Sequence, residues 1–411
     1  MPKVERDTGN KSRITPYHST PRHIEQVVLS GAKKTLSPPK DRLITNPFDE
    51  PLMPLTKREI MELLRSEELL DSAVQNDTCD FHIHARQGVL MEMVVPQIAE
   101  GGVSLCYVMP NLKPPITSTE QALAYKAQLQ KLAPNVTFLM SLYLCQELTP
   151  EEIRNAKKHG IVGVKSYPRG VTTNSESGIE SYSIYYPVFK AMEEVGMILN
   201  LHGELPSDVD QDTCVMNAEE KFLVHLKQLH NDFPKLKIVL EHATTKAAVD
   251  MVKSLGDTIG CTITIHHLQL IVDDWAGQCH NFCKPVAKFP HDRQALRDII
   301  LEGTDSAPHP AYLKECSHSS AGVFTTPLAI PYLATILDSF GALDCLRKFA
   351  CENGKKFYGV SEEEGKYREI TLIKETSLVP HLYSFDKSLE EREGSVVPFL
   401  AGKNLTWRII N

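Results

Sequence analysis

Short apolar segments of this chain repeatedly end in a side chain that can bind a metal. The first is 79–86, Cys-Asp-Phe-His-Ile-His-Ala-Arg, in which Phe81 and Ile83 alternate with His82 and His84. Because successive side chains of a strand point to opposite faces, both imidazoles share one face and can hold one divalent ion. A His-x-His pair is common by chance, so the later segments decide how it is interpreted.

Four later segments have the same layout. Each is a short apolar run with a polar side chain at its C-terminal end, just before a turn or a loop. In (β/α)8 barrels, catalytic groups come from the C-terminal ends of different strands. The polar side chains at these ends are Lys165, His202, His242, Asp305 and His309.

Helical patterns lie between the apolar runs, which predicts an α/β fold of the (β/α)8 TIM-barrel type. Continuous apolar runs are typical of parallel strands that are covered on both faces. We expect strands near 78–84, 103–109, 136–143, 161–167, 197–202, 237–242 and 259–265, and an eighth near 299–305. The helices are expected near 119–132, 150–159, 184–195, 217–231, 245–254 and 292–299.

Composition agrees with this class of protein. The chain has 411 residues, enough for a barrel of ~250 residues with insertions, and 42% of them are hydrophobic. A net charge of −8 without a basic stripe argues against nucleic-acid binding. No apolar run approaches the ~18 residues of a membrane span. The ten scattered cysteines are interpreted as reduced thiols, which predicts a cytoplasmic protein.

The N-terminal region differs from the rest of the chain. Residues 1–50 are rich in Pro, Ser, Thr, Lys and Arg and lack apolar periodicity, so disorder is expected there. A helix is expected near 56–73, where Thr56 could cap it. We therefore divide the chain into an extension, 1–75, and a barrel domain, 76–411.

Several motifs identify the barrel domain with a known family. The domain resembles the dihydroorotases, which are zinc amidohydrolases of pyrimidine synthesis, and is most similar to the short, single-function type of bacteria and fungi. The resemblance runs from about residue 77 to the C-terminus. It depends on the segments 80–84, 108–111, 163–168, 172–174, 201–204, 241–246, 304–309, 321–322 and 398–402.

The resemblance implies a centre with two Zn²⁺ ions. Lys165 is the unusual member, because an ammonium has no lone pair for a metal. By itself it would be interpreted as a buried lysine paired with a carboxylate. In the family, CO2 converts this lysine into a carbamate (N6-carboxylysine) whose oxygens bridge the metals. The implied ligands are His82, His84, Lys165, His202, His242 and Asp305.

The resemblance also implies how the substrate, N-carbamoyl-L-aspartate or dihydroorotate, is bound. Asp305 is expected to transfer the proton as the catalytic residue, and the enzyme is expected to be a homodimer. The loop with Thr172 and Thr173 would fold over the substrate and exclude water. The other implied substrate-binding residues are Arg86, Asn111 and His309 by their side chains, and Lys284 and Ala321 by their backbone.

Two alternatives stay open at this point. A dihydropyrimidinase would act on a neutral ring and would not need Arg86 with Asn111 and His309. A catalytically impaired relative with a binding or assembly role is suggested by residues 295–303, which must supply the end of a helix, a turn and a strand. A strand rises ~3.3 Å per residue, so we expect an eighth strand made from 299–303 or a defective one.

Overall fold

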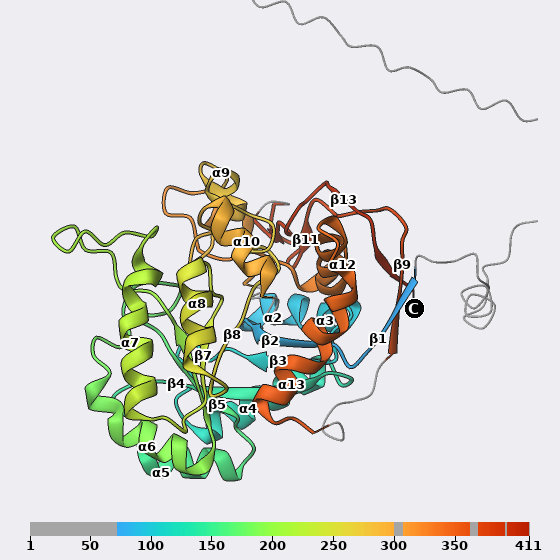
Figure 1. Ribbon diagram of the computed structural model, residues 1–411. Coiled ribbons are helices and arrows are strands. Elements are labelled where there is room, and N and C mark those ends of the chain that lie inside the picture. The colour runs from blue at the N-terminus through green and yellow to red at the C-terminus, as the bar shows by residue number, and fades with distance from the viewer. Residues whose placement is uncertain (1–71, 300–306, 362–368, 391–392, 411) are drawn as a thin grey trace, which may run out of the picture. The chain divides into compact units, whose positions relative to one another are not determined.

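Seven parallel strands form the centre of the barrel domain. The computed structural model describes residues 72–299, 307–361, 369–390 and 393–410. The strands are hydrogen-bonded in their order along the chain, and every neighbouring pair is parallel (Figure 1). They are β2 (Cys79–Ile83), β3 (Leu105–Val108), β4 (Thr137–Tyr143), β5 (Gly163–Ser166), β6 (Ile198–His202), β7 (Ile238–Glu241) and β8 (Ile259–Cys261).

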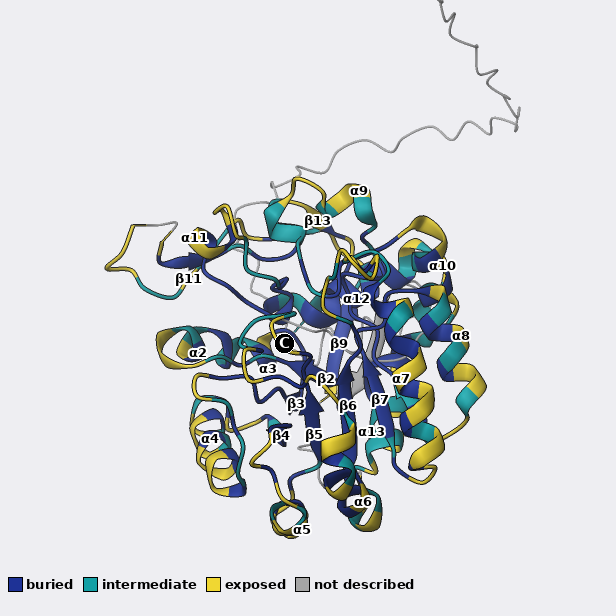
Figure 2. Ribbon diagram, turned by 90° about the vertical axis from the view of Figure 1, so that its left-hand side faces the viewer, coloured by how far each residue is buried: buried dark blue, intermediate teal, exposed yellow. Residues whose placement is uncertain are grey.

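Burial on both faces explains why these strands are apolar throughout. All residues of β2, β3, β5, β6 and β7 are buried, whichever face they point to. Figure 2 shows the strands in dark blue at the centre and the exposed positions on the surrounding helices. Such burial is typical of parallel sheets covered by helices.

Helices connect successive strands, and capping residues define their ends. The Ser118 side chain accepts a hydrogen bond from the Gln121 backbone in a capping box, and Thr149 and Thr245 cap two further helices. Gly196 ends another in the left-handed conformation that favours glycine. The helices are α4 (Thr119–Leu132), α5 (Pro150–Lys158), α6 (Tyr186–Val195), α7 (Ala218–Asp232), α8 (Lys246–Leu255) and α10 (Pro290–Asp298).

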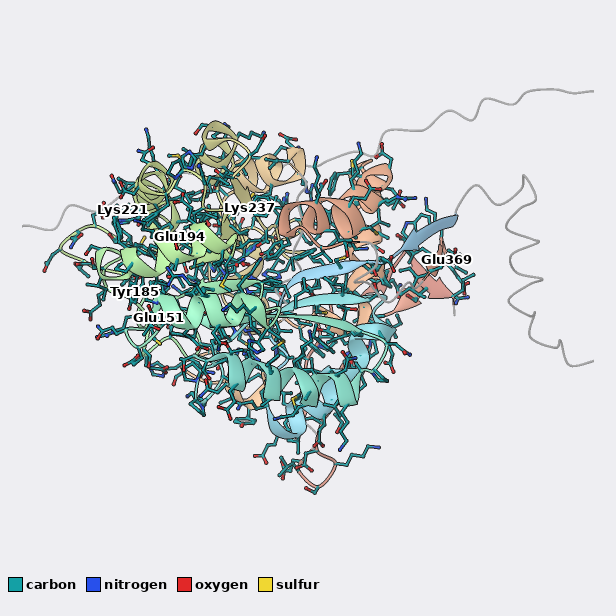
Figure 3. The ribbon with its side chains drawn as sticks, turned by 90° about the horizontal axis from the view of Figure 1, so that it is seen from below. Glu151, Tyr185, Glu194, Lys221, Lys237 and Glu369 are labelled. Carbon is teal, nitrogen blue, oxygen red and sulfur yellow. The ribbon has the colours of Figure 1, made fainter. Side chains whose placement is uncertain are left out.

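A surface ion pair links two neighbouring helices. Arg154 of α5 lies 2.9 Å from Glu194 of α6, and both side chains are partly exposed. Figure 3 shows Glu194 among the outer side chains of the domain. Exposed pairs of this kind contribute only ~0.2–1 kcal/mol. The apolar packing of the helices onto the strands is therefore the larger stabilising term.

The observed elements confirm the predicted α/β class and the (β/α)8-type arrangement. All seven described strands and six connecting helices occur where the sequence predicted them, and α4 has the predicted bounds. The predicted eighth strand stays a prediction, because 300–306 lie outside the described residues. Helix α10 ends at Asp298. Within the described part of the sheet, β2 and β8 are the two edges.

A small antiparallel sheet joins the two ends of the described chain. Strand β1 (Ser72–Asn76) pairs with β9 (Glu369–Ile373), and β9 pairs with β14 (Arg408–Ile410). Ser72 and Ala73 are thus in a strand and not in the predicted helix near 56–73, whose other residues lie outside the described ones. The folded domain begins no later than Ser72. Local periodicity missed this strand because its partner is far away in the sequence.

Shorter elements surround the strand ends and complete the domain. No helix in the described ranges is both long and apolar enough to cross a membrane. The helices are α2 (Gly88–Val94), α3 (Pro96–Glu100), α9 (Val272–Trp275), α11 (Ala311–Lys314), α12 (Ala329–Ser339), α13 (Asn353–Tyr358) and the π-helix η5 (Lys348–Glu352). Short 3-10 helices are η1 (Ser183–Tyr185), η2 (Cys279–Asn281), η3 (Thr326–Leu328) and η4 (Leu343–Cys345); the paired short strands are β10 (Ser377–Leu378) with β13 (Asn404–Leu405), and β11 (Tyr383–Ser384) with β12 (Ser395–Val396).

Candidate active site

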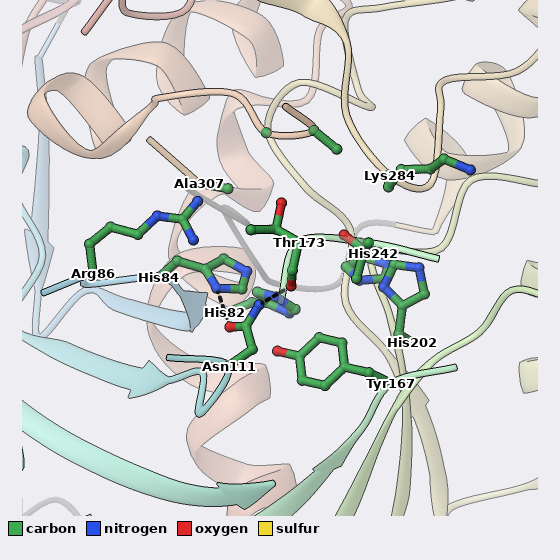
Figure 4. Close-up of a pocket in the computed structure, with 13 residues that line it drawn as sticks. His82, His84, Arg86, Asn111, Tyr167, Thr173, His202, His242, Lys284 and Ala307 are labelled. Carbon is green, nitrogen blue, oxygen red and sulfur yellow. Dashed lines mark hydrogen bonds between the residues drawn. The ribbon is translucent and has the colours of Figure 1, made fainter. Parts of the chain in front are cut away.

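The side chains at the C-terminal ends of the strands converge on one pocket. His202 ends β6, and His84 and His242 directly follow β2 and β7. Parallel strands in sequential order bring these ends to one face of the sheet. The residues that line the pocket, drawn in Figure 4, are His82, His84, Arg86, Asn111, Tyr167, Thr172, Thr173, His202, His242, Lys284, Ala307, Ala321 and Gly322.

Four histidines and a buried lysine lie close together at the strand ends of this site. The His82 ring centroid lies 5.3 Å from that of His84 and 5.1 Å from that of His242. The rings of His202 and His242 are 4.6 Å apart. We call His82, His84, Lys165, His202 and His242 the floor of the site; the sequence predicted each as a metal ligand, and the structure brings them together.

Burial favours the neutral form of two floor histidines. It lowers the pKa of His242 well below its usual value, and the positive charge that His202 and Lys165 can carry lowers it further. Burial also lowers the pKa of His202, although Glu204 acts in the opposite direction. A neutral imidazole has a lone pair available, which is the form that binds metals.

Carboxylate side chains orient two of the imidazoles. His82 donates through Nδ1 to the buried carboxylate of Glu241, and His202 Nε2 lies 2.9 Å from Glu204 Oε2. An ionised carboxylate can only accept, so these ring nitrogens carry the hydrogen and the other nitrogen of each ring has the lone pair. Such carboxylate partners of ligating histidines are typical of metal sites.

Lys165 lies fully buried within β5. Its Nζ is 3.9 Å from Glu241 Oε2 and 5.3 Å from the ring centroid of Tyr167. As an unmodified ammonium it thus faces a carboxylate, which is the arrangement expected of an ordinary buried lysine. Burial raises the pKa of Glu241, but nearby His82 and Lys165 outweigh this and lower it overall.

The chemistry of the floor fits divalent metal ions. Imidazole nitrogens and carboxylate-type oxygens are the ligands that zinc prefers. His242 is 2% exposed, and its Nδ1 has no hydrogen-bond partner among the described residues, as expected of a nitrogen that is reserved for another ligand. Lys165 fits only as a carbamate, because an ammonium repels a cation. The sixth predicted ligand, Asp305, lies outside the described residues.

Around the floor, a ring of side chains and loops forms the rim, which we define as Arg86, Asn111, Thr172, Thr173, Lys284, His309 and Ala321. Arg86 Nε donates to the Pro308 carbonyl at 2.9 Å, and its Nη2 lies 3.1 Å from His309 Nε2. The same His309 nitrogen lies 2.9 Å from the Ala321 carbonyl. One nitrogen cannot donate and accept at once, so the tautomer of His309 selects between these contacts.

The loop after β5 lies against Asn111. Asn111 Nδ2 donates to the Thr173 carbonyl at 2.9 Å, and Asn174 donates to the Asn111 carbonyl at 2.8 Å. Asn111 Oδ1 also lies 2.8 Å from His84 Nδ1. The sequence predicted a loop that folds over the pocket, and the structure places Thr172 and Thr173 in the pocket wall. Lys284 lies in the wall as well (Figure 4).

The sequence that forms this site matches a known protein family. The model of the amidohydrolase family matches residues 78–390. The chain belongs to the amidohydrolase family. This match covers the whole parallel sheet and the pocket.

Particular relatives of this amidohydrolase are dihydroorotases. It is 51% identical over 380 residues to the dihydroorotase of Mycosarcoma maydis, covering 80% of this chain and 96% of the relative. The dihydroorotase of Saccharomyces cerevisiae is 45% identical over 355 residues, covering 81% and 96%. A crystal structure of dihydroorotase from Saccharomyces cerevisiae in complex with 5-fluoroorotic acid matches with a TM-score of 0.79 and 43% identity, covering 83% of this chain and 99% of that one.

Sequence reasoning missed two carboxylates of this amidohydrolase site, Glu204 and Glu241. Both are at most 1% exposed. Glu241 also accepts a hydrogen bond from Asn200 at 2.5 Å and one from Thr262 at 3.2 Å. A glutamate at the end of the apolar run 237–241 was the available signal, since a buried charge needs partners.

A second group of metal-type side chains in the amidohydrolase has a different character. His266, His267 and Cys283 are buried with possible ligand atoms within 4.8 Å of one another. However, His267 Nδ1 lies 2.6 Å from Thr264 Oγ1, and its Nε2 lies 3.0 Å from the Pro285 carbonyl. Both ring nitrogens of His267 are thus used in hydrogen bonds within the fold.

Proposed function

We propose that this amidohydrolase is a zinc-dependent dihydroorotase, which interconverts N-carbamoyl-L-aspartate and (S)-dihydroorotate in de novo pyrimidine biosynthesis. The observation that carries the proposal is a floor of four histidines and Lys165 with the guanidinium of Arg86 in the wall above it. A metal centre beside a fixed cation suits a cyclic amide that bears a carboxylate. The names of the relatives support the same activity.

The floor residues would bind two zinc ions. His82 and His84 would hold the first with Asp305, and His202 and His242 would hold the second. Lys165, as a CO2-derived carbamate, would bridge them. When bound, the ions lower the pKa of a water molecule and polarise the amide carbonyl of the substrate.

The rim residues would bind and orient the substrate. Arg86 uses Nε for the Pro308 carbonyl, so the planar fork of its two terminal nitrogens is the part that can meet a carboxylate. Asn111 and His309 would complete that contact, and the backbone of Lys284 and Ala321 would bind the ring. We expect 5-fluoroorotic acid, a ring with the same carboxylate, to bind here too.

Proton transfer would be the task of Asp305. In ring opening, water adds to the amide carbonyl and the carbon–nitrogen bond breaks. Asp305 takes the proton from the water and passes it to the ring nitrogen that leaves. In ring closure the same proton moves back. The loop with Thr172 and Thr173 would exclude bulk water during these steps.

The alternatives differ in the charge of the substrate and in competence. A dihydropyrimidinase acts on neutral rings, and Arg86 in the pocket wall favours an anionic substrate instead. An impaired relative would have the floor without turnover, which depends on Asp305. We further propose a homodimer in the cytoplasm; light scattering on the purified protein measures the dimer directly.

One experiment distinguishes these three hypotheses. Purified protein loaded with zinc and bicarbonate is assayed for ring opening of dihydroorotate and of dihydrouracil, and zinc is counted by mass spectrometry. We expect two zinc ions per chain and turnover of dihydroorotate. Faster turnover of dihydrouracil would favour a dihydropyrimidinase, and two ions without turnover would indicate an impaired relative. His202→Asn should remove zinc and activity, whereas His291→Asn, at a side chain 70% exposed, should not.

A further inference from the structure

Lys314, the last residue of α11, ends among three backbone carbonyls. Its Nζ donates to the carbonyls of Phe282 at 2.8 Å, Ser320 at 2.9 Å and Gly322 at 2.8 Å. The residue is only 3% exposed. An ammonium has three N–H donors, so each of them has one acceptor here. This explains how a charged group can be buried without a carboxylate.

The three carbonyls belong to two segments that are distant in sequence. Phe282 lies two residues before Lys284, and Gly322 directly follows Ala321. The Gly322 N–H also donates to the Phe282 carbonyl at 3.1 Å. Lys284, Ala321 and Gly322 all line the pocket. Lys314 therefore links two parts of the pocket wall from behind, without lining the pocket itself.

Movement of either segment would change the pocket, because both segments carry residues that line it and Gly322 packs closely against its neighbours. A Cβ atom on Gly322 would lie 2.3 Å from the Ala307 carbonyl oxygen and 3.0 Å from His309 Cδ2. His309 in turn contacts Arg86 and the Ala321 carbonyl. A side chain at position 322 would therefore not fit, so the Gly322 backbone lies close against Ala307 and His309.

We propose that Lys314 is a positioning residue, which links the segments that carry Lys284 and Ala321 and thereby sets how tightly the pocket binds its substrate. This inference rests on the proposed function, since the ligand is a dihydropyrimidine carboxylate. The floor has separate support from Glu204 and Glu241. Loss of the Lys314 link should therefore weaken substrate binding more than the chemical step.

The link should depend on pH. Burial lowers the pKa of Lys314 to about 8, although nearby thiols act in the opposite direction. Above this pH the amine is neutral and has two N–H groups for three carbonyls, so one carbonyl loses its donor. The surrounding titratable or aromatic groups are the thiols of Cys279 and Cys283, His309, the Phe282 ring at 6.0 Å, and the His280–Glu315 pair, whose atoms lie 2.9 Å apart.

The test compares Lys314→Met with Lys190→Met, a change at an exposed position of α6. At pH 7 we expect Lys314→Met to raise KM for dihydroorotate and Kd for 5-fluoroorotic acid about tenfold, with kcat changed less than about twofold. Lys190→Met should match wild type. In wild type, KM should rise between pH 7 and pH 9, and in Lys314→Met it should stay constant over that range.

Several outcomes would overturn the inference. Folded Lys314→Met with unchanged KM and Kd would do so, and a constant wild-type KM from pH 7 to pH 9 would refute the dependence on the proton. If Lys314→Met does not fold, amide hydrogen exchange of wild type decides: segments 279–285 and 319–323 should exchange faster above pH 8, relative to α6, after correction for intrinsic rates. Failure of the proposed function has a different signature, since zinc-loaded wild type would then neither turn over dihydroorotate nor bind 5-fluoroorotic acid.

Discussion

The floor and the rim of the pocket are positioned by opposite means. On the floor, side chains project from the ends of rigid strands, and buried carboxylates fix them, as Glu241 fixes His82. At the rim, much of the surface is loop backbone, and buried side chains such as Lys314 and Asn111 fix that backbone. In one region the backbone positions the side chains, and in the other side chains position the backbone.

This difference separates the expected consequences of mutation. Changes on the floor should remove metal and lower kcat, because the side chains there would hold the ions that activate water. Changes at the rim should raise KM, because the atoms there contact the ligand and can shift with a loop. Mutations that mix these effects would show that the two regions are coupled.

The largest effect is expected on the floor at Lys165. Lys165→Ala removes the amine that would become the bridging carbamate, so we expect activity to fall below detection. Short carboxylic acids such as acetate should restore part of it, because only the oxygens of the bridge are needed. Native mass spectrometry should show the added mass of one CO2 on wild type and none on the variant. Active wild type without this adduct would refute the bridge.

A smaller loss of metal affinity and activity is expected when a floor ligand is unchanged but the carboxylate that orients it is replaced. Glu241→Gln removes the charge that faces His82 Nδ1 and Lys165. Changes to such partners typically lower metal affinity or activity ~10–100-fold. Zinc titration and kcat measure both quantities. The matched control is Glu194→Gln on exposed α6; equal behaviour of the two variants would mean that Glu241 has no role in positioning the floor.

The floor was largely predictable from sequence, and the reason is local. Each floor residue lies at or near the C-terminal end of a strand-length run, and parallel strands must bring such ends together. The capped helices between them were predictable for the same reason, since Ser118, Thr149 and Thr245 lie beside the helices they cap. Each of these inferences needs only the residues of one strand or helix and those directly beside it.

The elements that escaped prediction depend on partners far along the chain. Strand β1 exists because of β9, and Lys314 has its role because Phe282 and Gly322 approach each other in the fold. An isolated lysine in a short helix is normally read as a surface residue. Only the structure shows that it is buried, so sequence patterns described the rim less completely than the floor.

At the rim, Arg86→Lys tests whether this region determines substrate binding and leaves the chemical step unchanged. Lysine keeps the charge but loses the planar fork that meets a carboxylate at two points. It would also lose the contact with the Pro308 carbonyl. We expect KM for dihydroorotate to rise about tenfold with kcat nearly unchanged, since ~1.4 kcal/mol corresponds to a factor of ten. A fall in kcat at constant KM would place Arg86 with the floor.

The smallest effect is expected from lengthening the segment between α10 and Ala307, where Asp305 lies. Residues 299–306 lead from the end of α10 to Asp305 and Ala307, and each strand residue adds ~3.3 Å. A closed barrel has no edges, whereas β2 and β8 are edges within the described sheet. If the native segment is too short for a full strand, extra length should hold Asp305 more firmly in position.

We therefore predict that four apolar β-branched residues inserted between Leu301 and Gly303 raise the melting temperature by about 2–4 °C and raise kcat several-fold. Asp305 would then share the rigid support of the floor, and near a reacting centre a displacement of ~1 Å can change rates ~100-fold. The matched control is a Gly-Ser insertion of equal length, which adds reach without strand preference and should leave the melting temperature unchanged or lower. Calorimetry and the dihydroorotate assay measure both effects. Equal results for the two insertions would show that strand formation at this position does not limit the enzyme.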